Sequence, residues 1–348
     1  MKIRIDNEKV SVEVPTRIDL AGGTLDIWPL CSILSPVVTV NLAINLMVEA
    51  EASWRSDGKF RIEAVDLKKS REASTLQEFS NGTGLPLLST LTAELLSLAE
   101  GETGVDIERG LTLRTHSHVP EGSGLGGSSA LSIAVAVALR QLTHLNLTDE
   151  ALIRIVQDVE TRLLGAPTGY QDYYPPLYGG LSALRYQWGR VLRHEIPLKD
   201  KIEDRLLLFY SGQSHHSAWP NWKMLRSTID ESFSQERLVE KLGLLASFKK
   251  INSAADVCWR ALKMGDWDLL AEAVAVEWEI RSRLCEGMVP PPLSKSMDAA
   301  MEAGAKALKI CGAGGGGSFF ALVDPGKKEE VASAVKKTGA TPLHFSVY

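Results

Sequence analysis

The sequence is poor in cysteine and has no excess of basic charge. Its four cysteines do not have the spacing of zinc-ligand or redox pairs, so we interpret Cys31, Cys258, Cys285 and Cys311 as reduced thiols. The 348 residues include 38 basic and 43 acidic side chains, a formal net charge of −5. This balance provides no broad positive field and argues against nonspecific binding to nucleic acid or membranes.

The sequence also lacks long hydrophobic segments of the kind found in exported or membrane proteins. The first ten residues are charged and contain no apolar signal core, so we expect a cytoplasmic protein without export. The apolar run Ala130–Leu139 is too short to cross a bilayer. Hydrophobic residues make up 45% of the chain, enough for a real core, and the length predicts about two domains.

A glycine-rich segment at residues 119–139 is the most informative stretch. Residues 111–116 alternate apolar and polar, which predicts a strand leading into it, and the apolar run after it predicts a buried helix. Glycines allow close approach of the backbone to a ligand, and a helix N-terminus favours an anion such as phosphate. Ser128 and Ser129 can cap the first turn or offer a hydroxyl to a metal or phosphate.

Other interpretations of this segment are an ordinary glycine turn, a dinucleotide fingerprint and a Walker loop. The ordinary turn is about as well supported by this stretch alone. Gly122, Gly124 and Gly127 have the fingerprint spacing, but the acidic residue it requires would be Asp149, which opens another helix. A Walker loop requires a lysine that is missing here.

Local patterns predict further elements. Alternating valines predict a strand that ends at Pro15, and residues 38–48 predict a long half-buried strand, with residues 60–62 as its partner. Residues 66–78 are charge-rich and predict a solvated excursion. A helix follows Thr148. Glu160 lies beside the apolar face of this helix, and by default such a glutamate is solvated.

Three segments, taken together, resemble the signatures of the GHMP small-molecule kinases. Residues 15–26 resemble the first signature, in a form closer to heptose-phosphate kinases and fucokinase than to galactokinase. Residues 120–130 resemble the second and residues 309–317 the third. Residues 165–180 resemble the catalytic loop of the heptose-phosphate kinases, and Glu160 precedes its aspartate by twelve positions, as in galactokinase.

The resemblance implies an α+β fold of two domains with a site in the cleft between them. Residues 1–200 would form a domain like ribosomal protein S5 domain 2, carrying the nucleotide loop. Residues 201–348 would form a ferredoxin-like domain. Near the C-terminus the expected order of helix, two strands, helix and strand suits a split βαβ sheet.

The resemblance also implies roles for individual residues, with ATP and Mg²⁺ as cofactors. Asp172 would take the proton of the acceptor hydroxyl and Arg17 would support it. Mg²⁺ would be held by Glu160 and by Ser128, favoured over its neighbour. The nucleotide would contact Pro120, Gly122, Ser123, Gly124, Leu125, Gly126, Gly127, Ser128 and Ser129. The substrate would contact Gly23, Thr24, Asp26, Gly169, Gln171, Tyr174, Gly314 and Gly315, with the loop of residues 312–317 closing over the site.

The implied activity is transfer of the γ-phosphoryl group of ATP to a sugar or sugar phosphate, similar to heptose 7-phosphate, fucose or galactose. The heptose-phosphate pattern Thr-Gly-x-x-Arg is replaced by Ser211, Gly212 and then His215 and His216, so a free sugar stays open. These histidines are equally well read as ordinary loop residues. Two alternatives also stay open, a catalytically silent sugar and nucleotide sensor and a mevalonate-pathway kinase. A homodimer is left open as well.

Overall fold

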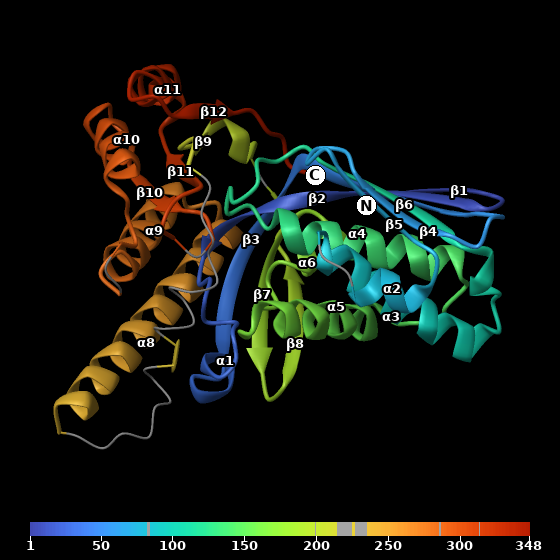
Figure 1. The fold of residues 1–348 in the computed structure, drawn as a ribbon. Helices are drawn as coiled ribbons and strands as arrows, with labels where there is room; N and C mark the ends of the chain where they lie inside the picture. Colours follow the sequence, from blue (N-terminus) through green and yellow to red (C-terminus); the bar gives the residue numbers. More distant parts are fainter. Residues whose placement is uncertain (82–83, 199, 214–224, 227–234, 285–286, 313) are drawn as a thin grey trace.

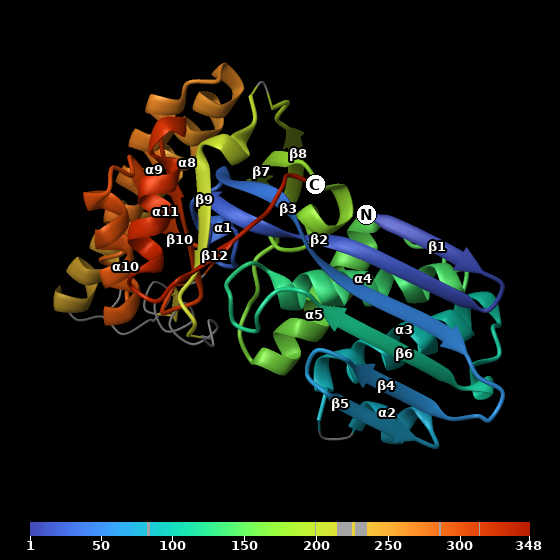
Figure 2. The same cartoon turned by 90° about the horizontal axis from the view of Figure 1, so that it is seen from above.

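The structure, a computed structural model, describes residues 1–348 except 82–83, 199, 214–224, 227–234, 285–286 and 313. Two sheets organise the described residues, an eight-stranded sheet from the first part of the chain and a four-stranded sheet from the last. Helices pack on both, so the predicted α+β fold with two domains is confirmed (Figures 1 and 2).

The eight-stranded sheet has the order β1-β2-β3-β6-β4-β5, and β7 joins it by pairing with β3 and β8. Helices α3, α4 and α5 lie together on one of its faces (Figure 1). The strands are β1 (Lys2–Asp6), β2 (Lys9–Ala21), β3 (Val37–Trp54), β4 (Phe60–Ala64), β5 (Lys69–Ala73), β6 (Leu111–Ser117), β7 (Leu181–Gln187) and β8 (Arg190–Glu195). The helices are α1 (Leu30–Ile33), α2 (Leu76–Asn81), α3 (Pro86–Thr103), α4 (Gly127–Leu142), α5 (Asp149–Leu164) and α6 (Tyr174–Tyr178).

The four-stranded sheet is antiparallel, with the order β10-β11-β9-β12. Its elements are β9 (Leu206–Tyr210), α8 (Gln235–Met264), α9 (Trp267–Arg281), α10 (Pro291–Glu302), β10 (Ala307–Ile310), β11 (Ser318–Leu322), α11 (Lys328–Lys336) and β12 (Thr341–Leu343). Strand β11 lies between β9 and β10, the two strands that helices α8, α9 and α10 connect. This is the split βαβ sheet of the ferredoxin-like fold, as predicted.

Strand β2 is longer than predicted because it continues through a proline. Pro15 pairs with Met47, and the register shifts between Pro15 and Thr16. Such an irregularity accommodates a residue that cannot donate to the ladder. The strand therefore carries Arg17 and Asp19 in its second half, where both are buried.

One other local prediction was wrong, and a second, the solvated segment 66–78, was right about exposure but missed its regular structure. Strand β4 does not pair with β3: it runs parallel to β6 and antiparallel to β5. The charged segment 66–78 contains β5 and the start of α2, and β5 is an edge strand whose polar side chains are exposed or half-buried. Charge on an exposed edge strand hides the alternation that a sequence pattern would show.

The end of the chain returns to the first sheet. Strand β12 ends at Leu343, and the backbone N–H of Tyr348 then donates to the carbonyl oxygen of Ala43 at 3.1 Å. The division of the chain at residue 200 stays a prediction, and residues 344–348 cross it. Among the described helices, none combines the length and the apolar character needed to cross a membrane.

Candidate active site

The predicted phosphate loop leads into helix α4. The helix begins at Gly127, earlier than predicted, and its N-cap is Gly126 at a positive φ of 73°. In the part of the chain that the structure describes, no side chain caps this helix. Ser128 and Ser129 lie inside its first turn and therefore do not act as caps. The N–H groups of the first turn are available to an anion.

The second glycine loop packs directly against the first. The backbone N–H of Ser318 donates to the carbonyl oxygen of Ser123 at 2.7 Å. A β-carbon at position 124 would lie 2.4 Å from the carbonyl oxygen of Cys311, and one at position 317 would lie 2.7 Å from that of Ser123. Only glycine permits such close contact. The two domains therefore meet at the phosphate loop.

Two glycines predicted to contact substrate lie against a methionine. The backbone N–H of Gly315 donates to the carbonyl oxygen of Met288 at 2.8 Å. A β-carbon at position 314 would lie 2.0 Å from the Met288 sulfur. Packing within the C-terminal domain accounts for both glycines, and the substrate contact of Gly314 and Gly315 stays a prediction.

Arg17 and Asp172 meet beside the phosphate loop, although they are 155 positions apart. Nε and Nη2 of Arg17 lie 2.8 and 2.7 Å from Oδ1 of Asp172, and Nη1 donates to the carbonyl oxygen of Gly124 at 2.5 Å. The Arg17 side chain is buried, whereas the Asp172 side chain is 29% exposed. Burial alone would lower the pKa of Arg17, but the charges of Asp172 and Asp19 raise it. The guanidinium therefore remains charged.

Glu160 is buried, in contrast to the solvated default for its position. Its carboxylate accepts hydrogen bonds from the hydroxyls of Ser129 at 3.0 Å, Ser132 at 2.9 Å and Tyr173 at 2.8 Å. Burial raises its pKa to about 7, against the opposing effect of these bonds. Ser128, the serine predicted to share a metal with it, is exposed. The loop contact to Glu160 is made by Ser129.

Asp26 forms a buried acceptor site together with Gln171. The backbone N–H of Gln171 donates to Oδ2 of Asp26 at 2.9 Å. Within the described residues, Oδ1 of Asp26 and Oε1 of Gln171 are buried without a hydrogen-bond partner. Burial raises the pKa of Asp26 to about 7. A β-carbon at position 169 would lie 2.1 Å from Oδ2, so Gly169 is needed for this packing. The two open acceptor atoms suit a ligand that donates hydrogen bonds.

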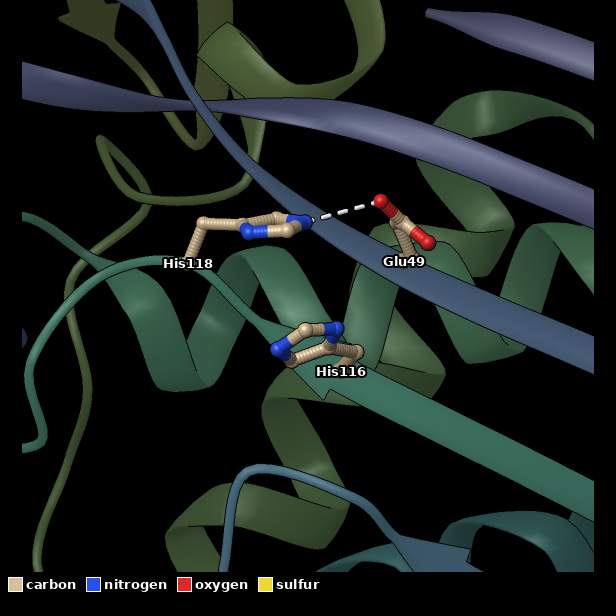
Figure 3. Close-up of side chains that lie close together, drawn as sticks. All are labelled: Glu49, His116 and His118. Atoms are coloured by element: carbon tan, nitrogen blue, oxygen red, sulfur yellow. Dashed lines mark hydrogen bonds and ion pairs between the residues drawn. The ribbon is translucent and has the colours of Figure 1, made fainter.

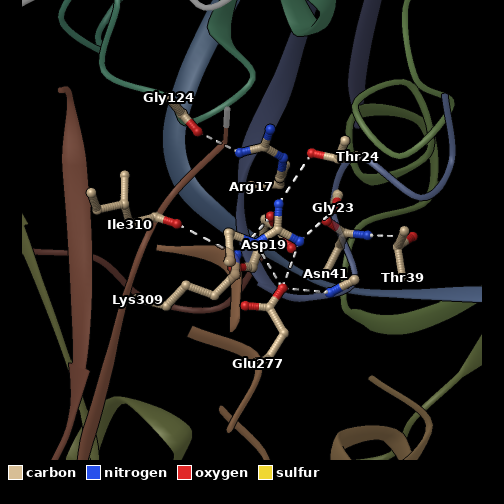
Figure 4. Close-up of polar contacts among 12 residues, drawn as sticks. Arg17, Asp19, Gly23, Thr24, Thr39, Asn41, Gly124, Glu277, Lys309 and Ile310 are labelled. Atoms are coloured by element: carbon tan, nitrogen blue, oxygen red, sulfur yellow. Dashed lines mark hydrogen bonds and ion pairs between the residues drawn. The ribbon is translucent and has the colours of Figure 1, made fainter. Parts of the chain in front are cut away.

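The turn before Asp26 is held by an ion pair from helix α9 (Figure 4). Nη1 of Arg281 donates to the hydroxyl of Thr24 at 3.1 Å, and Nη2 donates to the carbonyl oxygen of Gly23 at 2.6 Å. Glu277 binds Arg281 at 2.6 Å and accepts from the backbone N–H of Gly22 at 3.3 Å. The predicted substrate residues Gly23 and Thr24 are thus bonded to the C-terminal domain.

A second buried ion pair joins the two domains beside this turn. Nζ of Lys309 lies 2.7 Å from Oδ2 of Asp19, and both side chains are 0% exposed (Figure 4). Burial would raise the pKa of Asp19, but the charges of Lys309, Arg281 and Arg17 lower it. Sequence reasoning gave no role to Asp19, Glu277 or Arg281. The spacing of two residues between Arg17 and Asp19, which puts both on one face of a strand, was the available signal.

Four further residues named from the sequence remain: Tyr174, Pro120, His215 and His216. Tyr174 is buried in α6, and its ring centroid lies 5.8 Å from that of Tyr178. Pro120 accepts a hydrogen bond from the backbone N–H of Ser123 at 3.1 Å, which closes the start of the phosphate loop. His215 and His216 lie outside the described residues.

Phosphoryl transfer requires groups that position and neutralise the phosphates. The site provides an uncapped helix N-terminus, a partly exposed aspartate beside a buried arginine, and another carboxylate that is buried. The comparison with family models agrees. The model for the GHMP kinases N terminal domain matches residues 90–180, and that for the GHMP kinases C terminal matches residues 259–341. The chain belongs to the GHMP kinase family and is an ATP-dependent small-molecule kinase.

Relatives of two kinds are similar over nearly the whole chain. A D-glycero-alpha-D-manno-heptose 7-phosphate kinase of Campylobacter jejuni is 26% identical, covering 97% of this chain and 96% of the relative. A mevalonate kinase of Thermococcus sibiricus is 29% identical, covering 96% and 95%. The crystal structure of a D-glycero-D-manno-heptose 1-phosphate kinase from Bacteroides thetaiotaomicron shares the fold, with a TM-score of 0.74, 23% identity and coverage of 97% and 95%.

Proposed function

We propose that this kinase transfers the γ-phosphoryl group of ATP to a hydroxyl of a sugar or sugar phosphate. The observation that carries the proposal is the pair of open, buried acceptor atoms, Oδ1 of Asp26 and Oε1 of Gln171. Buried acceptors are costly unless a donor reaches them, and the hydroxyls of a sugar are such donors. The similarity to a heptose 7-phosphate kinase supports the same class of substrate.

The arrangement of charge disfavours mevalonate, the second candidate suggested by the relatives. Mevalonate carries a carboxylate, which a site would bind through a cation. Three described cations of the site are already bonded to carboxylates: Arg17 to Asp172, Arg281 to Glu277 and Lys309 to Asp19. The charges around the site therefore favour a neutral polyol portion of the substrate.

Asp172 and Arg17 would carry the chemistry. The acceptor oxygen forms a bond to the γ-phosphorus, the bond from this phosphorus to the bridging oxygen breaks, and ADP leaves. Asp172, whose side chain is partly exposed, takes the proton of the hydroxyl, and Arg17 stabilises the negative charge on the carboxylate and on the transferring group. The bond from Arg17 to the carbonyl oxygen of Gly124 fixes this pair relative to the phosphate loop.

The loop and helix α4 fit the β and γ phosphates, since the first-turn N–H groups are uncapped. Glu160 fits Mg²⁺ because no cation among the described residues pairs with its buried carboxylate, and burial raises its pKa to about 7. We assign Ser129 as the serine that accompanies Glu160, in place of Ser128, because Ser129 is hydrogen-bonded to it. When bound, Mg²⁺ neutralises charge on the phosphates.

A coupled assay of ADP release on a panel of acceptors tests the proposal. The panel contains galactose, fucose, mannose, a heptose 7-phosphate and mevalonate. We expect release that depends on one of the sugars or sugar phosphates. Release with mevalonate alone would overturn the substrate class. Sugar and ATP binding without release in any reaction would support the silent sensor instead.

We keep the cytoplasmic location and a homodimer as predictions. We expect no nucleic-acid or membrane partner, in line with the net charge of −5.

A further inference from the structure

Three side chains with metal-binding chemistry lie together on the eight-stranded sheet, outside the site described above (Figure 3). Glu49 comes from β3 and His116 from β6, and the two residues are direct partners in the antiparallel ladder. His118 follows two residues later, and its backbone N–H donates to the carbonyl oxygen of Met47 at 3.0 Å. This bond continues the strand pairing, so all three side chains project from the same face.

The ligand atoms are already close to one another. Nε2 of His118 lies 2.8 Å from Oε1 of Glu49, and the two imidazole centroids are 4.3 Å apart. One ligand atom from each of the three residues lies within 4.8 Å of the other two. The side chains of Glu49 and His118 are 49% and 45% exposed, so a hydrated ion can reach them.

We propose that Glu49, His116 and His118 bind a divalent transition cation of the Zn²⁺ class. Two imidazole nitrogens and one carboxylate oxygen, with water in the fourth position, are a ligand set that Zn²⁺ accepts. Imidazole ligands argue against Mg²⁺ and Ca²⁺, which prefer oxygen. Zn²⁺ bonds of about 2.0–2.2 Å require ligand atoms roughly 3.3 Å apart, which small side-chain rotations provide.

The charges around the cluster suit a cation. The register places Glu13 beside Glu49 on the neighbouring strand β2, while Glu51 lies two residues further along β3. Each of these two carboxylates is bonded to a lysine, Glu13 to Lys2 at 3.1 Å and Glu51 to Lys9 at 2.9 Å. Glu49 has no lysine or arginine partner among the described residues and bonds to His118 instead. Its negative charge is therefore available to a metal.

The site lies next to the phosphate loop along the chain. His118 is followed by Val119 and then by Pro120, where the loop begins. A bound cation would tie the end of β6 to β3 at the point where the chain enters the loop. Because only the folded chain brings the three ligands together, binding should raise the thermal midpoint of unfolding.

Zn²⁺ titration of the metal-stripped full chain tests this proposal. A chromophoric chelator reports free Zn²⁺, and excess Mg²⁺ occupies the carboxylates of the kinase site. We expect one equivalent to bind, and Glu49→Gln, His116→Asn and His118→Asn each to weaken binding by about tenfold or more. His344→Asn, which removes an exposed histidine elsewhere, should bind as the wild type does.

Two further measurements distinguish this site from binding elsewhere. Co²⁺ should give the visible absorption of a low-symmetry site in the wild type and lose it in the His116→Asn/His118→Asn double variant. Zn²⁺ should raise the thermal midpoint of the wild type and not that of the double variant. Equal affinity and stoichiometry in the wild type and the double variant would overturn the proposal, as would no binding to the wild type.

Discussion

Two ion pairs lie side by side on strand β2 and differ in their access to solvent. Arg17 pairs with Asp172, whose side chain is 29% exposed. Two residues later, Asp19 pairs with Lys309, and both side chains are fully buried. We call the partly exposed pair of Arg17 and Asp172 the open pair, and the buried pair of Asp19 and Lys309 the sealed pair. Strand β2 contributes the cation to the open pair and the anion to the sealed pair.

The difference in exposure indicates that one pair takes part in the reaction and the other holds the two domains together. A carboxylate that is partly exposed can exchange a proton with a bound hydroxyl, so the pair of Arg17 and Asp172 can take part in the reaction. Lys309 and Asp19 are buried and already bonded to each other, so this pair serves to fix β10 against β2. Substitutions in the two pairs should therefore change different quantities.

The open pair should give the largest effect. Asp172→Asn removes the proton acceptor while keeping the shape of the side chain, so we expect kcat to fall by about 10²–10⁴-fold with ATP affinity retained. Steady-state kinetics and nucleotide binding on the same sample measure both. Asp158→Asn, at an exposed position of α5, is the matched control and should retain full activity. Near-normal turnover of Asp172→Asn would exclude this residue from the reaction.

The sealed pair should affect stability instead. Lys309→Met leaves the charge of Asp19 buried without its partner, and we expect a loss of about 3–5 kcal/mol in the free energy of unfolding. Lys306→Met is the control, because Lys306 makes solvent-exposed pairs with Asp268 and Asp324 and should cost under about 1 kcal/mol.

Urea unfolding measures both variants. Adding Asp19→Asn to Lys309→Met should restore part of the loss, since the uncompensated charge is then removed. Equal losses for the Lys309 and Lys306 variants would mean that the buried pair has no special role in holding the domains together.

Glu160 and Asp19 are both buried carboxylates, but their pKa values shift in opposite directions, so pH distinguishes them. Burial raises the pKa of Glu160 from 4.5 to about 7, whereas cationic neighbours lower the pKa of Asp19. A raised pKa means that the folded state binds the proton more tightly than the unfolded state. The contribution of Glu160 is therefore fully favourable below about pH 4.5 and is lost as pH rises through 7.

In the absence of ATP and Mg²⁺, the wild type should therefore lose stability relative to Glu160→Gln between pH 5 and pH 8, by up to about 3 kcal/mol. Unfolding free energies of both proteins at several pH values measure this difference. Parallel pH profiles would show that the Glu160 carboxyl does not change its charge in this range.

The smallest expected effect distinguishes the two loop serines. Ser129→Ala removes a hydroxyl bonded to Glu160, so we expect the Mg²⁺ concentration for half-maximal activity to rise by about tenfold or less. Ser128→Ala, at an exposed position, is the matched control and should change it little. A larger effect at Ser128 would restore the assignment made from the sequence alone.

The phosphate loop and the elements on either side of it could be predicted from the sequence. The strand, glycine loop and helix around residues 111–142 follow from alternation and helical periodicity, which involve neighbours along the chain. The contact of Arg17 with Asp172 was anticipated through family resemblance. No local pattern contains a contact between residues 155 positions apart.

The missed features depend on distant contacts. Lys309 and Asp19 are 290 positions apart, and Arg281 and Thr24 are 257 apart. The local pattern alone left Glu160 solvated, and only the family resemblance predicted it in the site. Its bonds to Tyr173 and Ser132 are seen only in the folded chain. The proline in β2 hid the second half of that strand, since a register shift leaves no periodic signal.

The most direct test of the proposed function follows the phosphoryl group itself. In a single-turnover rapid-quench experiment with γ-³²P-labelled ATP and the acceptor identified from the panel, the wild type should move the label onto the sugar at the rate of turnover. Asp172→Asn should bind both substrates and leave the label on ATP. Release of the label as inorganic phosphate by the wild type, or transfer by the variant at the wild-type rate, would contradict the proposed function.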